Sequence, residues 1–267
     1  MRQQGSSGGD CTTVTLGEGI GSHTRLKAEG FPAAPLVEAI MAVQFGGGLS
    51  DTEATSLKEA LTPHYPNVNV TTHRDIRVNV EAETVELGDP RNIFRLEGKD
   101  ATEVALIRPE GLSVSQLAPY KSWDVLFDRY RRDFDTVIGA MESKTITRMA
   151  VRYINRIDVP LVGDIAHYED YLSVHIRVPD SIPAIGNFHL RFVMDVPELG
   201  ADATIQSAVF PPTVPDKASF ALDIDLAREK DIPQEREQFL ALFAEFRAAK
   251  NKLYQQFLTP KALEEFK

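Results

Sequence analysis

Three arginines recur at every fourth position of one segment, as Arg148, Arg152 and Arg156. The alternating pattern of this segment predicts a strand, and alternate residues of a strand share a face. Arginine carries a planar guanidinium fork that suits phosphate and carboxylate groups. Three such groups on one sheet face therefore predict a site for a small anionic ligand or an interaction partner.

Ion pairing within the fold is the alternative interpretation of the same arginines, with acids on neighbouring strands as partners. Glu38 is a natural partner, because it stands alone among apolar residues in another predicted strand. A buried carboxylate requires a cation or hydrogen-bond donors. We favour this structural interpretation over a ligand site, and a ligand site over catalysis.

The opposite face of the arginine strand carries two polar side chains, Tyr153 and Asn155, among apolar residues. An asparagine that points into a core has to find hydrogen-bond partners. Asn155 is therefore expected to tie down a loop or bulge, and the alternative is that it lines a cavity between sheet and helix. The full candidate ligand-binding set is Arg148, Arg152, Arg156, Glu38, Asn155 and Tyr153.

A polar run, Lys250-Asn251-Lys252, interrupts the last long helical pattern of the chain. Lys250 and Tyr254 are four residues apart and so share a helix face. A solvated last turn that is favoured by the helix dipole explains the lysines. Asn251 has a low helix propensity, which makes a specific contact the alternative.

Asp223 and Asp225 place two carboxylates on one face of a further predicted strand. Such a pair can bind a divalent cation or perform acid–base chemistry, but we interpret it as the solvent side of an edge strand. The six histidines form no HxH, HxxxH or HExxH pair, and P-loop, Gly-x-Ser-x-Gly and kinase signatures are absent from the sequence. We therefore expect no metal, no cofactor and no catalytic residue.

Two amphipathic helices are the strongest of the elements that must position these residues. Apolar residues recur at intervals of three and four from Trp123 to Met141 and from Gln234 to Phe257. In the first helix, Arg129 and Asp133 are expected on the polar face. Pro260 is expected to begin a short final helix.

Short apolar runs separated by turn residues predict antiparallel hairpins, because parallel strands need long crossovers. A capping-box pattern at Ser50 and Glu53 predicts a further helix that ends near Leu61. Pro160 is expected to close the arginine strand. The strands are expected at 35–45, 76–80, 93–96, 103–107, 112–114, 145–159, 171–178, 188–196, 204–210 and 219–226.

The fold class that follows is α+β: antiparallel strands with the two long amphipathic helices packed on them, in two similar halves. The halves are expected at residues 31–160 and 161–267, packed as one globular unit. Residues 1–30 are rich in Gly, Ser and Thr. They bury too little apolar surface to offset the entropy of ordering, so we expect a disordered tail.

Composition narrows the classes of partner. The chain has 267 residues and a formal net charge of -10, which disfavours nucleic acid. Cys11 is the one cysteine, so no intramolecular disulfide can form, which fits a reducing compartment. No secretory signal is recognisable, and no apolar stretch approaches the roughly 20 residues that span a bilayer. We expect a cytoplasmic protein without membrane contact.

Four segments together carry a family resemblance: PLVEAI at 35–40, YKSW at 120–123, VRYINRID at 151–158 and KN…FLT at 250–259. They resemble a sporadically distributed family of prokaryotic conserved hypothetical proteins. The resemblance spans Phe31 to Phe266, and the chain departs from it in its glycine-rich tail and in the Gly46–Gly48 loop. It implies no activity and no catalytic residue set. Patchy distribution is typical of laterally transferred genes, so the resemblance implies an accessory of a mobile-element or defence locus.

A non-catalytic binding or interaction protein is the function that we expect. Its partner would be another protein, a second copy of the chain or a small anionic ligand. A small-molecule binder that uses the arginine-lined sheet face is one alternative, and an enzyme of unrecognised type is another. An enzyme would require clustered titratable groups with perturbed pKa values.

Overall fold

The computed structural model describes residues 35–266, apart from residues 75, 80–83, 88, 142–143, 180 and 182–185. The described residues belong to one compact unit, Phe31–Lys267. The tail predicted at residues 1–30, with Cys11, lies outside the described residues. Residue 80, the last of the strand predicted at 76–80, also lies outside them.

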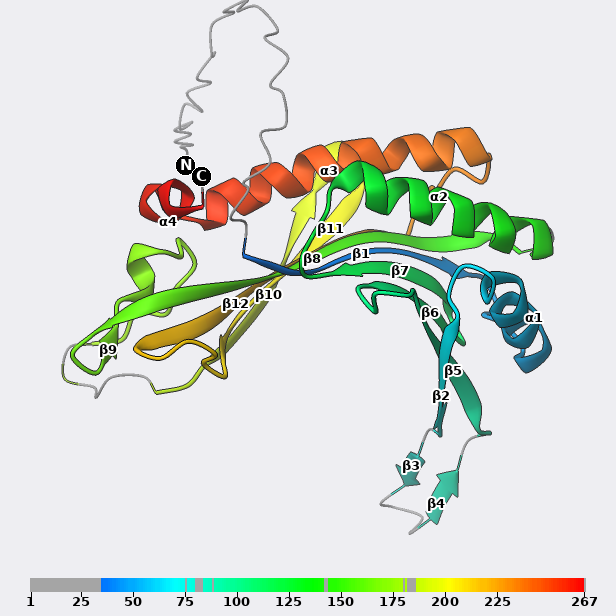
Figure 1. Ribbon diagram of the computed structural model, residues 1–267, viewed down its shortest axis with the longest axis horizontal. Helices are drawn as coiled ribbons and strands as arrows, with labels where there is room; N and C mark the ends of the chain where they lie inside the picture. The colour runs from blue at the N-terminus through cyan, green and yellow to red at the C-terminus, as the bar shows by residue number, and fades with distance from the viewer. Residues whose placement is uncertain are drawn as a thin grey trace, which may run out of the picture. The chain divides into compact units, whose positions relative to one another are not determined.

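One antiparallel sheet forms the framework of this unit (Figure 1). Its strands and those of a separate hairpin are β1 (Leu36–Phe45), β2 (Asn67–His73), β3 (Ile76–Asn79), β4 (Thr84–Leu87), β5 (Arg91–Glu97), β6 (Glu103–Arg108), β7 (Gly111–Leu117), β8 (Ile146–Val162), β9 (Ile165–Ala166), β10 (His189–Val196), β11 (Ala201–Phe210) and β12 (Lys217–Arg228). Across the sheet the order is β10-β11-β12-β8-β1-β7-β6-β5-β2, with β9 paired to the end of β8. β3 and β4 form the hairpin.

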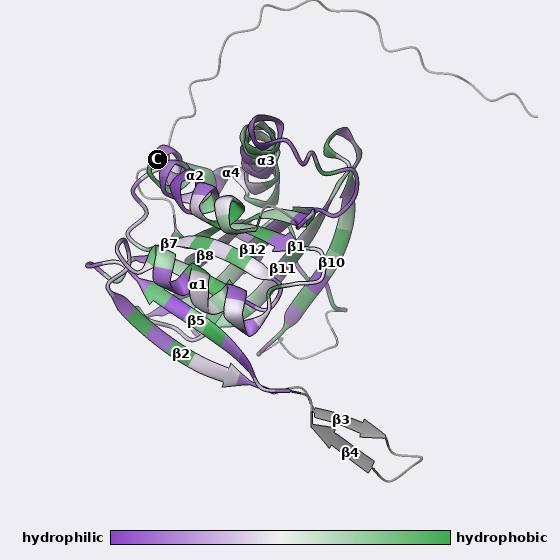
Figure 2. Cartoon of the chain, turned by 90° about the vertical axis from the view of Figure 1, so that its right-hand side faces the viewer, coloured by the Kyte–Doolittle hydropathy of each residue, from purple (hydrophilic) through white to green (hydrophobic). Residues whose placement is uncertain are grey.

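The described helices lie on one face of this sheet, as Figure 2 shows. They are α1 (Asp51–Leu61), α2 (Trp123–Ala140), α3 (Arg236–Phe257) and α4 (Pro260–Glu265), with 3-10 turns η1 (Tyr168–Asp170) and η2 (Pro197–Leu199). Aromatic rings join α2 to α3, and the centroids of Tyr130 and Phe243 lie 4.8 Å apart. The predicted α+β class is confirmed. Within the described residues, no helix is both long and apolar enough to cross a bilayer.

Hydrogen bonds fix where the helices begin. Ser50 and Glu53 form the predicted capping box at the start of α1, each side chain bonding to the other's backbone amide. The Ser122 side chain accepts from the Val125 amide at the start of α2. Thr259 caps α4 in the same way, through the Ala262 amide. The polar residues that precede the apolar stripes therefore set the helix register.

β8 has two contrasting faces. Tyr153 and Asn155 are buried toward the helices, with exposed fractions of 5% and 3%. Arg148, Arg152 and Arg156 are half-buried on the opposite face, which the described helices leave open. The alternation therefore separates the two groups of candidate residues across the sheet.

The structure differs from the predicted strands in several places. Residues 171–178 form no strand, because the backbone there bonds to the end of α3: Ser173 N–H donates to Phe257, and Leu172 forms an isolated bridge with Leu258. β8 continues through Pro160, whose missing N–H faces away from β12. The sequence pattern does not predict β2, β4 or β9, where it is polar or very short.

Strand order repeats outward from the central β1–β8 pair. On one side β1 is followed by β7, β6 and β5, and on the other β8 is followed by β12, β11 and β10. In both directions the chain starts at the centre, moves to the outside, works back inward and ends in a helix on the same face.

Candidate functional site

The arginine row lies on the open face of the sheet, and its members are paired with acids of the chain. Arg152 makes a two-pronged contact with Asp223, with Nε 2.9 Å from Oδ1 and Nη2 2.6 Å from Oδ2. Arg148 Nη2 donates to Asp225 Oδ2 at 3.1 Å. A ligand anion on this face would have to displace these carboxylates.

Asp223 and Asp225 lie in the interior of the sheet, because β12 pairs with both β11 and β8. Their interpretation as the solvent side of an edge strand is therefore wrong. Asp223 is 6% exposed. The hydrogen bonds from Arg152 to Asp223 raise the pKa of Arg152. Burial raises the pKa of Asp225, and the positive charge of Arg148 opposes this effect.

Arg156 and Glu38 complete the open-face set. Arg156 donates through Nε to Asp158 at 3.2 Å and through Nη2 to the Ser219 hydroxyl at 3.0 Å. Glu38 is half-buried and lies opposite Ile154. It forms no ion pair with any described residue and is the weakest of the influences that raise the pKa of Arg152. The arginines pair with β12 and with β8 itself, rather than with β1.

Asn155 ties two strands together on the helix-covered face. Its Nδ2 donates to the Leu222 carbonyl of β12 at 3.1 Å. This contact supplies the hydrogen bonding that a buried amide requires. The geometry is that of a structural tie between β8 and β12.

Lys250 lies on the same helix-covered face, between α3 and β8. The residue is 7% exposed, and its Nζ atom lies 3.5 Å from the centroid of the Tyr153 ring. The Tyr153 hydroxyl is 3.2 Å from the Tyr120 hydroxyl. The interpretation of Lys250 as part of a solvated turn is wrong, because α3 directs this position toward the sheet.

Positive charge gathers around Lys250. Among the described residues no carboxylate pairs with it, and burial, followed by the charge of Arg247, lowers its pKa to about 7. Arg247 is itself placed over the Trp123 ring, with Cζ 5.3 Å from the centroid, and lies 3.7 Å from the exposed Asp124. We call Lys250, Arg247, Tyr153, Tyr120 and Trp123 the Lys250 cluster.

Three of the four sequence segments at 35–40, 120–123, 151–158 and 250–259 meet in the Lys250 cluster. Tyr120 comes from the segment before α2, Tyr153 from β8 and Lys250 from α3. Chemically, the cluster can hold an anion, since it offers two cations and two hydroxyl groups. It can also present a neutral amine near pH 7.

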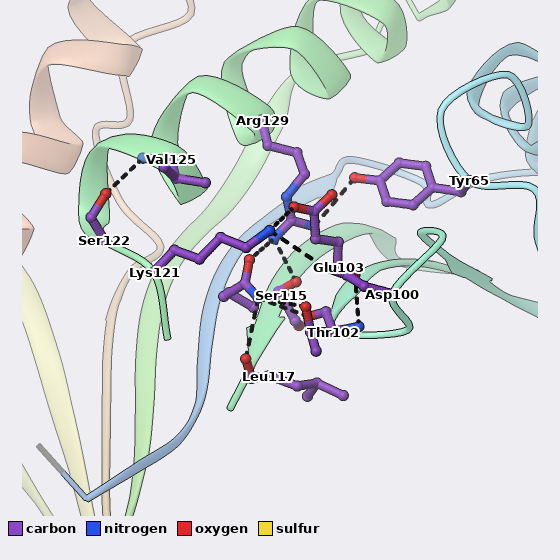
Figure 3. Close-up of polar contacts among 11 residues, drawn as sticks. Tyr65, Asp100, Thr102, Glu103, Ser115, Leu117, Lys121, Ser122, Val125 and Arg129 are labelled. Atoms are coloured by element: carbon purple, nitrogen blue, oxygen red, sulfur yellow. Dashed lines mark hydrogen bonds and ion pairs between the residues drawn. The ribbon is translucent and has the colours of Figure 1, made fainter. Parts of the chain in front are cut away.

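A second polar cluster joins α2 to β7 (Figure 3). Arg129, 6% exposed, donates through Nη2 to the Ser115 carbonyl at 2.7 Å. The Asp133 carboxylate accepts from the Tyr65 hydroxyl and, at 2.8 Å, from Arg132 Nε. The polar-face prediction for Arg129 and Asp133 is wrong, since both are buried.

Contacts within the fold satisfy the Asp133 carboxylate of this second cluster, whereas Arg129 Nε is buried without a hydrogen-bond partner among the described residues. Burial raises the pKa of Asp133, and the hydrogen bond from Tyr65 and the charge of Arg132 oppose that effect. At its outer end, Lys121 bridges Glu103 at 3.0 Å and Asp100 at 3.4 Å, as Figure 3 shows. The second polar cluster holds α2 on the sheet.

Neither the arrangement of metal-ligating residues nor the comparison with known proteins assigns a further functional site. In the part of the chain that the structure describes, no group of three or more His, Cys, Asp or Glu could hold a metal ion. No protein-family model and no curated protein matches the chain. The Lys250 cluster is a candidate site because of its burial and its contacts. The candidate ligand-binding set predicted from the sequence contains Tyr153 of this cluster and omits the other members, Lys250, Arg247, Trp123 and Tyr120.

Proposed function

We propose that this protein is a non-catalytic binding protein, and that its ligand is a small molecule with an anionic group held by Lys250. The observation that carries this proposal is a lysine, 7% exposed, that contacts a tyrosine ring and no described carboxylate. A buried charge without a counter-ion is costly. The anion of a ligand would supply the missing partner.

The surroundings of Lys250 favour an anion. Arg247 adds a second positive charge within one helical turn, and the hydrogen-bonded pair of Tyr120 and Tyr153 hydroxyls leaves one O–H that can donate. The arginine fork suits carboxylate, sulfate and phosphate groups. The arginine row on the other face is a weaker candidate for the same ligand, because Asp223 and Asp225 already occupy its hydrogen bonds.

Fluorescence of Trp123 tests this proposal. It is the one tryptophan of the chain, and Arg247 lies over its ring. Sodium sulfate is the probe, titrated against sodium chloride of equal ionic strength, since sulfate keeps its charge throughout the pH range used. We expect a saturable signal below pH 7, and an affinity that falls about tenfold per pH unit above it, because binding needs the proton on Lys250.

Two variants test whether the sulfate response depends on Lys250. Lys250→Met removes the cation and is expected to abolish the saturable signal. Lys261→Met is the matched control: Lys261 also lies over a tyrosine ring, at 4.7 Å from the Tyr171 centroid, but its side chain is 52% exposed and pairs with Asp170. An unchanged sulfate response in Lys250→Met contradicts the proposal. Native mass spectrometry against the denatured mass would then reveal any ligand retained elsewhere.

An enzyme that uses Lys250 as a nucleophile is the second candidate. A pKa of about 7 leaves much of this lysine as the neutral amine, the form that attacks a carbonyl carbon. Imine formation with acetaldehyde releases water, and cyanoborohydride reduces the imine to a stable secondary amine. Peptide mapping at pH 7 should then find Lys250 modified ahead of Lys261. Modification of Lys261 alone would eliminate this candidate.

Two broader proposals concern the architecture and the setting. The repeated strand order around the β1–β8 pair supports two similar halves, each ending in a helix. In this proposal β8 belongs to the second half, and the boundary would lie between α2 and β8 instead of at residue 160. An accessory role in a mobile-element or defence locus rests on the family resemblance alone.

A further inference from the structure

β10 is an outer strand of the sheet and pairs, among the described strands, with β11 alone. Its register runs without a shift from His189 opposite Ala208 to Val196 opposite Ala201. Figure 2 shows it along one margin of the sheet. Proteins commonly protect such an edge with a bulge, a proline or charged side chains; β10 has no bulge and no proline, and its charged residues are one arginine and one aspartate. The strand is regular enough to accept another strand.

The direction of the backbone groups fixes which residues face outward. Val209 N–H donates to the Phe188 carbonyl, so residues in phase with Phe188 point their backbone groups at β11. The residues of opposite phase, Arg191, Val193 and Asp195, point theirs away from the sheet. They are the residues that a further strand would hydrogen-bond.

Two side chains of this edge, Arg191 and Asp195, are charged. Arg191 and Asp195 form no ion pair within the described part of the chain, although they lie on the same face of β10. Asp195 also lies opposite Asp202 of β11, and like charges directly opposite each other destabilise a sheet. Val193 and Met194 are 51% and 36% exposed. The β10 edge therefore combines two like charges that lie opposite each other, Asp195 and Asp202, with exposed apolar side chains.

We propose that β10 pairs with β10 of a second copy of this chain, antiparallel and centred on Val193. An antiparallel pair centred there places each Arg191 opposite the partner's Asp195, and Val193 opposite the partner's Val193. Each Arg191 then offsets the repulsion between the acids opposite one another on β10 and β11. The two sheets continue into one across the dimer axis.

Other registers fit this edge less well. A pairing one residue out of step brings outward backbone groups against inward ones and cannot form the ladder. A pairing centred on Phe192 keeps the ladder but places Arg191 opposite the partner's Val193. The opposite edge strand, β2, carries no acidic residue and so offers no comparable charge match.

Sedimentation velocity of the full chain over a range of concentrations tests the proposal. We expect a dimer whose dissociation constant rises about tenfold or more in Arg191→Asp, which opposes like charges twice across the axis. Asp195→Arg should weaken the dimer similarly. The double variant Arg191→Asp with Asp195→Arg restores both pairs and should restore the dimer. A monomer at all concentrations overturns the proposal, as does a dimer that the single charge reversals leave unchanged.

A disulfide test checks the register independently. In a Cys11→Ser background, Val193→Cys should cross-link under mild oxidation, because residues opposite each other in an antiparallel pair lie within disulfide reach, about 5.5 Å between Cα atoms. Met194→Cys is the control, since its counterpart in the other copy is offset by two residues. Faster cross-linking of Met194→Cys than of Val193→Cys contradicts this register.

Discussion

The Nζ atom of Lys250 lies 3.5 Å from the centroid of the Tyr153 ring, and this contact joins α3 to the central strand β8. A cation over an aromatic face gains about 0.5–2 kcal/mol. Removing an ammonium group from water costs several kcal/mol. The ring therefore offsets part of the cost of burial, and the lowered pKa of Lys250, about 7, expresses the remainder.

The pH dependence of stability should reveal this uncompensated charge. In the unfolded chain a lysine titrates near pH 10.4, and in the folded chain Lys250 titrates at about 7. Between these values the unfolded state holds more protons, so this lysine makes stability rise with pH. Lys250→Met should therefore be more stable than the natural chain below pH 7, with the difference shrinking toward pH 10. Urea unfolding at about pH 6.5, 8 and 9.5 measures it.

Lys261→Met supplies the comparison for this experiment. Lys261 is ion-paired with Asp170 at 3.0 Å, and that contact raises its pKa. Its removal should leave the difference in unfolding free energy nearly flat between pH 6.5 and 9.5. If the difference in unfolding free energy between Lys250→Met and the natural chain is also independent of pH, Lys250 titrates normally in the folded protein.

Arg152→Ala should destabilise the fold, because it leaves Asp223 buried without its cation. The expected loss is about 2 kcal/mol, since the guanidinium is partly exposed and the carboxylate is not. The double variant Arg152→Ala with Asp223→Ala removes both charges and should recover part of that loss. Chemical denaturation gives both values. A double variant less stable than the sum of the single changes would argue against a compensating ion pair.

Alternation in the sequence was sufficient to divide β8 into its two faces. It placed Arg152 on one face and Tyr153 and Asn155 on the other, as the structure has them. It could not identify the partners of the arginines, because sheet order decides them. β12 lies next to β8, so Asp223 reaches Arg152 across 71 positions of the chain.

The helical periodicity of the sequence is sufficient to predict that some charged residues are buried, although composition alone does not reveal them. Lys250 follows Phe246 by four residues and precedes Leu253 by three, so it continues the apolar stripe of α3. Asp133 likewise follows Tyr130 by three residues and precedes Val137 by four in α2. A charged residue in line with such a stripe is buried and must find a partner. Which partner it finds depends on the packing of helix against sheet, which no local pattern contains.

The Tyr65 hydroxyl should contribute measurably to stability through Asp133. It donates to a carboxylate whose side chain has an exposed fraction of 0%, so Tyr65→Phe leaves that carboxylate with fewer donors. We expect a loss of about 2 kcal/mol in the free energy of unfolding. Tyr171→Phe is the control, because its hydroxyl bonds to the exposed Glu265 at 3.0 Å, and it should cost less than about 1 kcal/mol. Equal losses would mean that the hydrogen bond from Tyr65 to Asp133 contributes no more to stability than the exposed one from Tyr171 to Glu265.

Two glycines should respond to alanine in opposite directions. A Cβ added at Gly111 would lie 2.1 Å from the Val43 carbonyl oxygen, where β7 pairs with β1. Gly111→Ala must therefore push the central strands apart, and we expect a loss of about 2–4 kcal/mol. At Gly139, in the last turn of α2, an added Cβ meets no atom within 4 Å. Gly139→Ala should stabilise the protein by about 0.5–1 kcal/mol through helix propensity. Thermal unfolding of the two variants measures both signs, and a stable Gly111→Ala protein would show that β1 and β7 are not paired in this register.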